Sequence, residues 1–302
     1  MPTISVVIPV RNAGSMLRRT LESVQAQRYP ALEVLVLDGG STDETNDVIA
    51  EFSSLITWSR SHPDNSAVEA ISEGMAHVRG DIVALLSADD WLENGALICV
   101  GTMFQHQPDL DVITGGVLIV EEREGEVRVI EKIDDRSSLD LKLDKVLARP
   151  LTHARFIRTD KYRELGGYDQ TLSESADLDF LIRLVRNNPA AATTTRIVYT
   201  FRQHPHSATL GSDRVRLAKV HSENLLIFEK HMASMLSTHE HGILRGFHSR
   251  HGLRLIGYHV KKGELLAALS VFLRVWLWNG NWHMQVAAWV VQSLCIETFR
   301  RP

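Results

Sequence analysis

The first hundred residues alternate short apolar runs with segments whose apolar residues recur at helical spacing. Between the first two runs, residues 15–27 place Leu17, Leu21 and Val24 on one helical face. The apolar runs have the length of buried strands and cover residues 5–10, 32–37, 55–58 and 81–86, of which the third is the weakest. This order of strands and helices predicts a mostly parallel sheet with right-handed crossovers and helices on its faces.

Local start and stop signals agree with this order. The stretches 41–44 (STDE) and 66–69 (SAVE) both fit a capping box, in which a hydroxyl and a carboxylate satisfy the first free amides of a helix. Pro30 and Gly80 follow two of the predicted helices and stop them.

Polar clusters follow the first, second and fourth predicted strands, at residues 11–12, 38–43 and 87–90. Because ligands of such sheets bind at the carboxyl ends of the strands, we expect the three clusters to share one edge. In the second cluster, glycines permit close approach of the backbone to a ligand, although a tight turn with a helix cap would look the same.

Two adjacent acids, Asp89 and Asp90, close the strand at 81–86. Their repulsion predicts that a bound cation or plain solvent relieves them. Magnesium or manganese accepts one or two carboxylates together with substrate phosphate oxygens, so these acids could hold a cation that meets a diphosphate. The alternative is a solvated acidic loop.

After residue 110 the alternation of predicted strands and helices becomes less regular. Residues 111–120 and 127–132 predict a hairpin across Gly125, and two later strands flank a helix at 176–188. From about residue 212 onward only helices are predicted. We therefore expect an α/β domain over 1–211 and an all-helical region over 212–302.

Composition and charge narrow the class of protein. The chain has 302 residues, is 44% hydrophobic and carries a net charge of −4, which argues against a general nucleic-acid binder. Two distant cysteines fit a reducing compartment, and the opening residues read as a strand and not as a signal peptide. We expect a cytoplasmic location, with peripheral contact at the inner face of a membrane as an option.

The C-terminal region is basic and rich in tryptophan, with 12 Lys or Arg against 6 Asp or Glu from residue 211 onward. Its apolar run at 265–278 is interrupted by Arg274 and is too short to span a bilayer. Its tryptophans are at positions 276, 278, 282 and 289, and basic helices that carry the first three could lie on an anionic membrane surface. The slightly favoured alternative is a helical subdomain whose aromatic residues pack inside it or against a second subunit.

Six motifs in order, IPVRN, DGGSTDET, HPDNS through LLSADD, RTDKYRELGGYD, ESADLDFLIRL and FRQHPHSAT, resemble the family 2 glycosyltransferases. The resemblance covers about residues 3–210. It implies the GT-A fold, a Rossmann-like and mostly parallel central sheet flanked by helices, here with an all-helical C-terminal extension. It further implies a donor-binding half over 1–110 and an acceptor and catalytic half over 111–211.

The resemblance also implies the residues that bind a nucleotide-diphosphate sugar. The metal ligand of the family's DXD element falls on Asp89, whereas Ser87 stands where many relatives carry the first aspartate, and Arg11 replaces a frequent tyrosine. The remaining donor-binding residues that it implies are Pro9, Val10, Asn12, Asp38, Gly39, Ser41, Asp64, Ala88 and Asp90.

Asp177 matches the catalytic base of the family, which removes the proton of the acceptor hydroxyl. Its position at the start of a predicted helix stabilises the carboxylate as an anion, so positioning must supply the catalysis. Asp179 is expected to be a structural partner, and Glu174 is the reserve candidate. His204, and less so His206, match a histidine that the family often places near the diphosphate, which makes His204 a second candidate metal ligand beside Asp89.

The function implied is an inverting, single-displacement transfer, assisted by Mn²⁺ or Mg²⁺, from a nucleotide-diphosphate sugar to a glycan, polysaccharide or lipid-linked acceptor. Strand one is followed by RNAGSM and not by GxGxxG, and no GxxxxGK[ST] occurs, which disfavours dinucleotide-dependent oxidoreductases and P-loop phosphotransferases. A non-catalytic sugar-nucleotide sensor or scaffold remains the alternative. The donor sugar, its base and the acceptor do not follow from the sequence.

Overall fold

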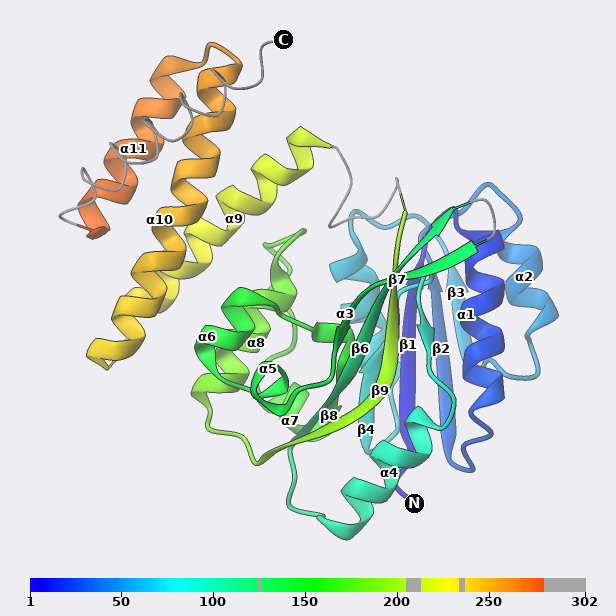
Figure 1. Cartoon of the computed structure of the whole chain (residues 1–302). Helices are drawn as coiled ribbons and strands as arrows, with labels where there is room; N and C mark the ends of the chain where they lie inside the picture. The colour runs from blue at the N-terminus through cyan, green and yellow to red at the C-terminus, as the bar shows by residue number, and fades with distance from the viewer. Residues whose placement is uncertain (124–125, 205–212, 234–236, 280–302) are drawn as a thin grey trace. The chain divides into compact units, whose positions relative to one another are not determined.

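A computed structural model describes residues 1–123, 126–204, 213–233 and 237–279 (Figure 1). The chain divides into two compact units, residues 1–211 and residues 212–302, which are described separately. The first unit is built on a nine-stranded sheet and the second on helices.

The sheet of the first unit has the strand order β3-β2-β1-β4-β8-β6-β9-β5, and β7 pairs with β6 outside this path. Its strands are β1 Ile4–Val10, β2 Leu32–Asp38, β3 Trp58–Ser61, β4 Ile82–Leu85, β5 Trp91–Leu92, β6 Val112–Arg123, β7 Glu126–Ile133, β8 Arg155–Arg158 and β9 Ala191–Gln203. The helices are α1 Gly14–Ala26, α2 Thr45–Glu51, α3 Ala67–His77, α4 Ala96–His106, α5 Arg136–Leu139, α6 Leu143–Ala148, the 3₁₀ turn η1 Thr152–Ala154, α7 Thr159–Glu164 and α8 Ala176–Arg186.

Strands β3, β2, β1 and β4 pair in parallel, as the alternation of strands and helices predicted. The third strand, however, was predicted at residues 55–58 and lies at Trp58–Ser61. Leu55 and Ile56 instead pack against the core from the turn that follows α2, which explains their apolar character.

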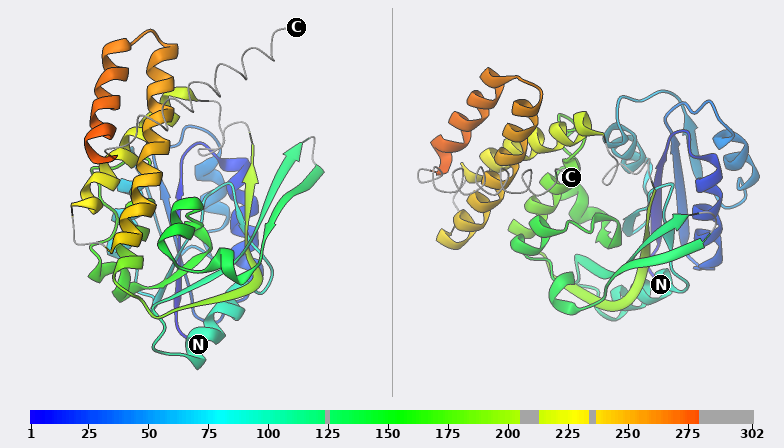
Figure 2. Two further views of the ribbon diagram at one scale, coloured as in Figure 1. Left: turned by 60° about the vertical axis from the view of Figure 1, so that its left-hand side comes forward. Right: turned by 45° about the horizontal axis from the view of Figure 1, so that its top comes forward.

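Alternate residues of the parallel strands face opposite layers, as the two-residue period of a strand requires. Ile4, Val6 and Ile8 face the core that α1, α2 and α4 share with the sheet. On the other face α3 approaches closely, because a Cβ atom on Gly74 would lie 2.9 Å from Leu37 and 3.2 Å from Val7. Helices therefore cover both faces of the parallel half, as Figures 1 and 2 show.

The second half of the sheet is mixed. Strands β6 and β7 form the predicted antiparallel hairpin, although residues 124–125 at its tip lie outside the described part. Strand β9 runs parallel to β6 and antiparallel to β5. Its register against β6 shifts at Gly115–Gly116 and again at Gly116–Val117, so that Gly115 pairs with Thr194 while Val117 pairs with Tyr199.

The second unit contains α9 Arg214–Met232, α10 Thr238–Lys261 and α11 Leu265–Asn279. Asp213 caps α9, and a capping box of Ser237 and Glu240 starts α10. Helix α10 packs against both α9 and α11. In the part of the chain that the structure describes, no helix combines the length and the hydropathy needed to cross a bilayer.

The buried His251 and the half-buried His221 contact one another in this unit. The Nδ1 atom of His251 lies 3.0 Å from Nδ1 of His221 and 3.2 Å from the amide nitrogen of Asn224. Two neighbouring donors require that this nitrogen carry no proton. Burial, aided by the nearby charges of His221 and Arg254, lowers the pKa of His251 to about 3, and burial lowers the pKa of His221 to about 4.

We therefore predict that acid destabilises the second unit. An unfolded histidine takes up its proton near pH 6.5, whereas these two stay neutral in the fold, so stability is complete above pH 6.5 and falls as the pH is lowered toward 4. The slope reaches ~1.4 kcal/mol per pH unit for each histidine. Thermal unfolding followed by circular dichroism between pH 7 and pH 5 should show a smaller loss for His251→Gln than for the wild type. The exposed His239→Gln is the control and should keep the wild-type slope.

Candidate functional site

The loops after β1 and β2 are joined by hydrogen bonds. The backbone amide of Asn12 donates to Ser41 Oγ (2.7 Å), and the backbone amide of Thr42 donates to Asn12 Oδ1 (2.9 Å). The first two polar clusters thus share one edge of the sheet. The capping box predicted at 41–44 is wrong, because Glu44 and not Ser41 precedes α2 and Ser41 is engaged in joining the loops. The box predicted at 66–69 holds in part, since Ser66 accepts from the backbone amide of Glu69 (3.2 Å).

Of the residues predicted to bind the donor from the first loop, Arg11 and Asn12 are exposed, Pro9 is half-buried and Val10 is buried. Asn12 has a left-handed backbone (φ +50°), a conformation that asparagine tolerates better than most residues.

Asp38 is fully buried beneath the second loop. Its carboxylate accepts hydrogen bonds from the backbone amide and hydroxyl of Ser41, from the hydroxyl of Ser61 and from the side-chain amide of Asn46. A ribose or base could bond to this carboxylate only by replacing one of these partners. In this arrangement Asp38 holds the loop in shape.

Asp64 closes over the same loop. Its side chain forms an ion pair with Arg60 (3.1 Å), and Arg60 also donates to the backbone carbonyls of Asp38 (2.6 Å) and His62 (2.9 Å). A Cβ atom on Gly39 would lie 3.1 Å from the Asp64 carboxylate. The glycine therefore permits the approach of this acid to the backbone, and Asp38, Gly39 and Asp64 form one cluster.

The two adjacent acids after β4 point in different directions. Asp90 is 1% exposed, and its carboxyl group is bonded to the hydroxyl of Tyr199 and to the backbone amide of Arg202 (2.8 Å), both on β9. Thr20 of α1 donates to the backbone carbonyls of Ala88 (2.9 Å) and Asp90 (2.7 Å) and fixes the turn from the other side.

The repulsion between the two acids is thus relieved in a way that the sequence did not predict. Burial, and then the charge of Asp89, raise the pKa of Asp90 to about 8, so this carboxyl group is mostly neutral at pH 7. Neither a cation nor solvent is needed for that purpose. Asp90 was predicted as a donor-binding residue, but the structure places it inside the fold as an anchor of the turn, next to the buried Ala88.

Asp89 is turned the opposite way and remains partly accessible, with 27% of its side chain exposed. Its Oδ2 atom lies 2.9 Å from Nε2 of His204, which follows the end of β9. The structure thus brings together the two residues predicted as metal ligands from positions 115 apart in sequence. His206, the weaker histidine candidate, lies outside the described residues.

Asp177 lies in the first turn of α8 and is partly accessible. Its Oδ2 atom accepts a hydrogen bond from the Thr152 hydroxyl (2.9 Å) of η1. Asp179 is buried and paired with Arg183 (2.8 Å), whose guanidinium also donates to the backbone carbonyl of Gly167 (2.7 Å). Asp179 therefore has the structural role expected of it. Glu174, the reserve candidate, is half-buried just before the helix.

His153, which was not singled out from the sequence, lies between the loop after β4 and the start of α8. Its Nε2 atom lies 3.3 Å from the Ser87 hydroxyl, and its ring stacks on Tyr199 with 5.6 Å between ring centroids. Burial lowers the pKa of His153, while the nearby charges of Asp177 and Asp89 oppose that shift. One short turn, with Thr152 on Asp177 and His153 on Ser87, therefore joins the loop after β4 to the start of α8.

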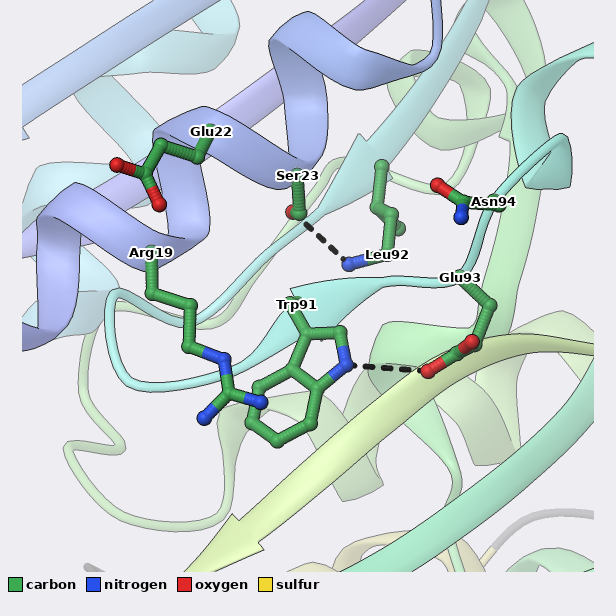
Figure 3. Close-up of a pocket in the computed structure, with 7 residues that line it drawn as sticks. All are labelled: Arg19, Glu22, Ser23, Trp91, Leu92, Glu93 and Asn94. Atoms are coloured by element: carbon green, nitrogen blue, oxygen red, sulfur yellow. Dashed lines mark hydrogen bonds between the residues drawn. The ribbon is translucent and has the colours of Figure 1, made fainter. Parts of the chain in front are cut away.

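A separate cavity of about 300 Å³ lies between α1 and β5 (Figure 3). The Arg19 guanidinium lies 3.6 Å from the centre of the Trp91 ring, and the Trp91 indole donates to Glu93 (3.0 Å). The cavity is lined by Arg19, Glu22, Ser23, Trp91, Leu92, Glu93 and Asn94 and by none of the predicted donor-binding or catalytic residues.

Comparison with known proteins agrees with this geometry. Residues 5–166 match the model of a family described as glycosyl transferase family 2. An uncharacterized glycosyltransferase of Mycobacterium tuberculosis is 30% identical over 190 residues, which cover 60% of this chain and 68% of that protein. An uncharacterized glycosyltransferase of Rickettsia felis is 26% identical over 203 residues, which cover 62% of this chain but only 32% of that protein.

Solved structures support the fold. Residues 1–349 of TarS from S. aureus, in complex with UDP-GlcNAc, match with a TM-score of 0.70 at 16% identity and cover 96% of this chain and 92% of that one. The mannosyltransferase PcManGT of Pyrobaculum calidifontis, in complex with GDP-Man and Mn²⁺, matches with a TM-score of 0.61 at 16% identity and covers 99% and 81%. The GT-A fold expected from the sequence, with a helical C-terminal part, is confirmed.

The family match covers more than half of the chain and agrees with the named relatives. The chain belongs to glycosyl transferase family 2 and is a glycosyltransferase.

Proposed function

We propose that this enzyme transfers a sugar from a nucleotide-diphosphate sugar to an acceptor hydroxyl by a single displacement that inverts the anomeric centre. The observation that carries the proposal is the turn at 152–154, which holds Asp177 through Thr152 and contacts Ser87 of the DXD element through His153. A candidate base and a candidate leaving-group site are thereby fixed relative to one another. In this proposal residues 1–110 bind the donor, and residues 111–211 supply the base and the acceptor side.

On the donor side, the accessible side chains along one edge of the sheet are Arg11, Asn12, Ser87 and Asp89, whereas Asp64 is mostly buried against Arg60. Arg11 presents a planar guanidinium that can stack on a base or bond to phosphate oxygens. Asp38 acts indirectly, because its carboxylate shapes the loop whose backbone meets the donor. Binding of nucleotide sugars by TarS and by PcManGT supports this donor class, and both UDP and GDP sugars remain candidates.

Asp89 and His204 fit a divalent cation in their chemistry. A carboxylate oxygen and an imidazole nitrogen are both ligands of Mn²⁺, and the two side chains already converge to 2.9 Å. Among the described residues no group of three or more His, Cys, Asp or Glu side chains could hold a metal ion. Diphosphate oxygens and water would therefore complete the shell, as is usual for Mg²⁺ sites. The bound cation would neutralise charge that develops on the departing diphosphate.

Asp177 acts as the general base. Its carboxylate receives the proton of the acceptor hydroxyl as the hydroxyl oxygen bonds to the anomeric carbon and the bond from that carbon to the diphosphate breaks. The Thr152 hydroxyl orients Oδ2. With Asp177 as base, no enzyme nucleophile is needed.

Asp177→Asn removes the base and keeps the size of the side chain. Because general-base assistance contributes roughly 10²–10⁴-fold, kcat should fall by that factor, equivalent to roughly 3–5 kcal/mol, while the donor Kd stays unchanged. Product formation and calorimetric donor titration measure the two quantities. The exposed Asp160→Asn is the matched control. Near-normal transfer by Asp177→Asn would remove Asp177 from this role.

Metal dependence is tested by binding alone. Titration of UDP, GDP and dTDP should show affinity for at least one nucleotide that rises by roughly tenfold or more with Mn²⁺, since the cation joins Asp89 to the diphosphate. Asp89→Asn should abolish this increment and leave the binding measured in EDTA unchanged. Equal affinities with Mn²⁺ and with EDTA would contradict the metal site.

His153 should act together with Ser87. In a double-mutant cycle, Ser87→Ala and His153→Ala should couple by about 0.5–1.5 kcal/mol in kcat/KM, the range of a hydrogen bond. We expect the loss to fall mainly on kcat, because the turn positions the reacting groups. His153→Gln, which retains a nitrogen near the Nε2 position, should recover part of the rate. Strict additivity of the two substitutions would show that the contact has no role in transfer.

A further inference from the structure

Helix α11 lacks the polar face that a helix exposed to water normally carries. Arg274 is the one charged residue in its 15 positions, and it is turned inward to form a bidentate pair with Glu229 of α9 (2.6 and 2.7 Å). A helix that is apolar all round is usually buried on every side. Among the described residues of this unit, 213–233 and 237–279, only one side of α11 is covered.

The buried side packs on α10 and α9. Val275 is fully buried and contacts Gly252 so closely that a Cβ atom there would lie 2.5 Å from its methyl group. Ala268 is also buried.

The opposite side carries a row of large exposed side chains, which we call the leucine row. Its members are Leu265 (68% exposed), Leu266 (85%), Leu269 (52%), Leu273 (48%), Trp276 (45%) and Leu277 (76%). They recur at helical spacing and therefore lie on one face. The slightly favoured interpretation of the sequence packs Trp276 within the helical unit or against a second subunit, and within this unit 45% of Trp276 is exposed. Contiguous apolar surface of this kind marks a contact with a partner or a membrane.

The charges around the row favour a negatively charged partner. From Thr238 to Asn279 the chain carries six Lys or Arg and two glutamates. Five of these cations are exposed, namely Arg245, Arg250, Arg254, Lys261 and Lys262, and the last two lie four and three residues before Leu265, with Glu264 between them and the row. A second copy of this chain that docked through the same face would bring the same positive charge to the contact and be repelled.

We propose that the leucine row docks on the surface of an anionic lipid bilayer. Leucine and tryptophan side chains enter the boundary between headgroups and acyl chains, and Lys261 and Lys262 meet the lipid phosphates. Apart from Ser270, the exposed face of α11 between Leu265 and Leu277 carries no hydrogen-bonding side chain other than the Trp276 indole. Protein interfaces typically need about one hydrogen bond per 100–200 Å², whereas a lipid phase needs none. This inference does not depend on the proposed donor, metal or base.

Vesicle flotation of the full chain tests the proposal, with phosphatidylglycerol/phosphatidylethanolamine vesicles compared with pure phosphatidylcholine vesicles. The wild type should float with the anionic vesicles. The double variant Leu266→Glu/Leu269→Glu should bind them more weakly by roughly tenfold or more, since two charges would enter the apolar boundary. Leu226→Glu is the control outside the row, because Leu226 (51%) on α9 is as exposed as Leu269 (52%), and it should bind within about twofold of the wild type.

A second double variant changes the charge beside the leucine row and leaves the row itself unaltered. Lys261→Ser/Lys262→Ser should weaken binding to anionic vesicles and leave the helical circular dichroism spectrum unchanged. Failure of the wild type to float, or equal flotation of the leucine variant and the Leu226→Glu control, would overturn the proposal. So would sedimentation velocity, without lipid, that shows a wild-type dimer converted to monomers by Leu266→Glu/Leu269→Glu, because the row would then be a subunit interface.

Discussion

The geometry of the candidate site depends on the buried carboxyl group of Asp90. Its bonds to Tyr199 and to the backbone of Arg202 tie the turn after β4 to strand β9, which arrives more than a hundred residues later. With Asp90 held inside, Asp89 is forced outward, and the same strand delivers His204 to it. An ionised Asp90 would place a negative charge inside the fold, beside that of Asp89. The burial of Asp90 therefore explains both its raised pKa and the outward direction of Asp89.

A three-residue turn gives the site its second constraint. Thr152 and His153 are adjacent, yet one contacts the candidate base and the other contacts Ser87 in the loop after β4. The side chains of η1 thereby join two regions that belong to different halves of the sheet. Asp38, Arg60 and Asp64 form a separate network at the edge of the parallel half.

Much of the fold follows from periodicity and turn chemistry. The parallel strands, the β6–β7 hairpin and α8 were all predicted, because buried strands and an amphipathic helix leave clear local patterns. The strand at 55–58 was misplaced because Leu55 and Ile56 pack on the core from a turn, which periodicity alone does not distinguish from a strand. Asp90 and His153 could not be interpreted correctly, since their partners on β9 and in the loop after β4 are distant in sequence. A buried tyrosine more than a hundred residues later in the chain leaves no signal beside an aspartate.

Tyr199, Arg202 and His204 all come after the stretch of β9 whose pairing with β6 is irregular. Between the pairs Gly115–Thr194 and Val117–Tyr199, β9 advances five residues while β6 advances two, a difference of three. Neighbouring residues of a strand point to opposite faces of the sheet. Because β9 has an odd number of extra residues here, the residues after the bulge that face inward are those that would otherwise face outward. The loss of one residue from 195–198 would therefore turn Tyr199 away from Asp90. We therefore expect the number of residues in 195–198 to vary far less among functional descendants of this chain than the number at the tip of the β6–β7 hairpin. A residue added at that tip does not change which residues of β9 face inward.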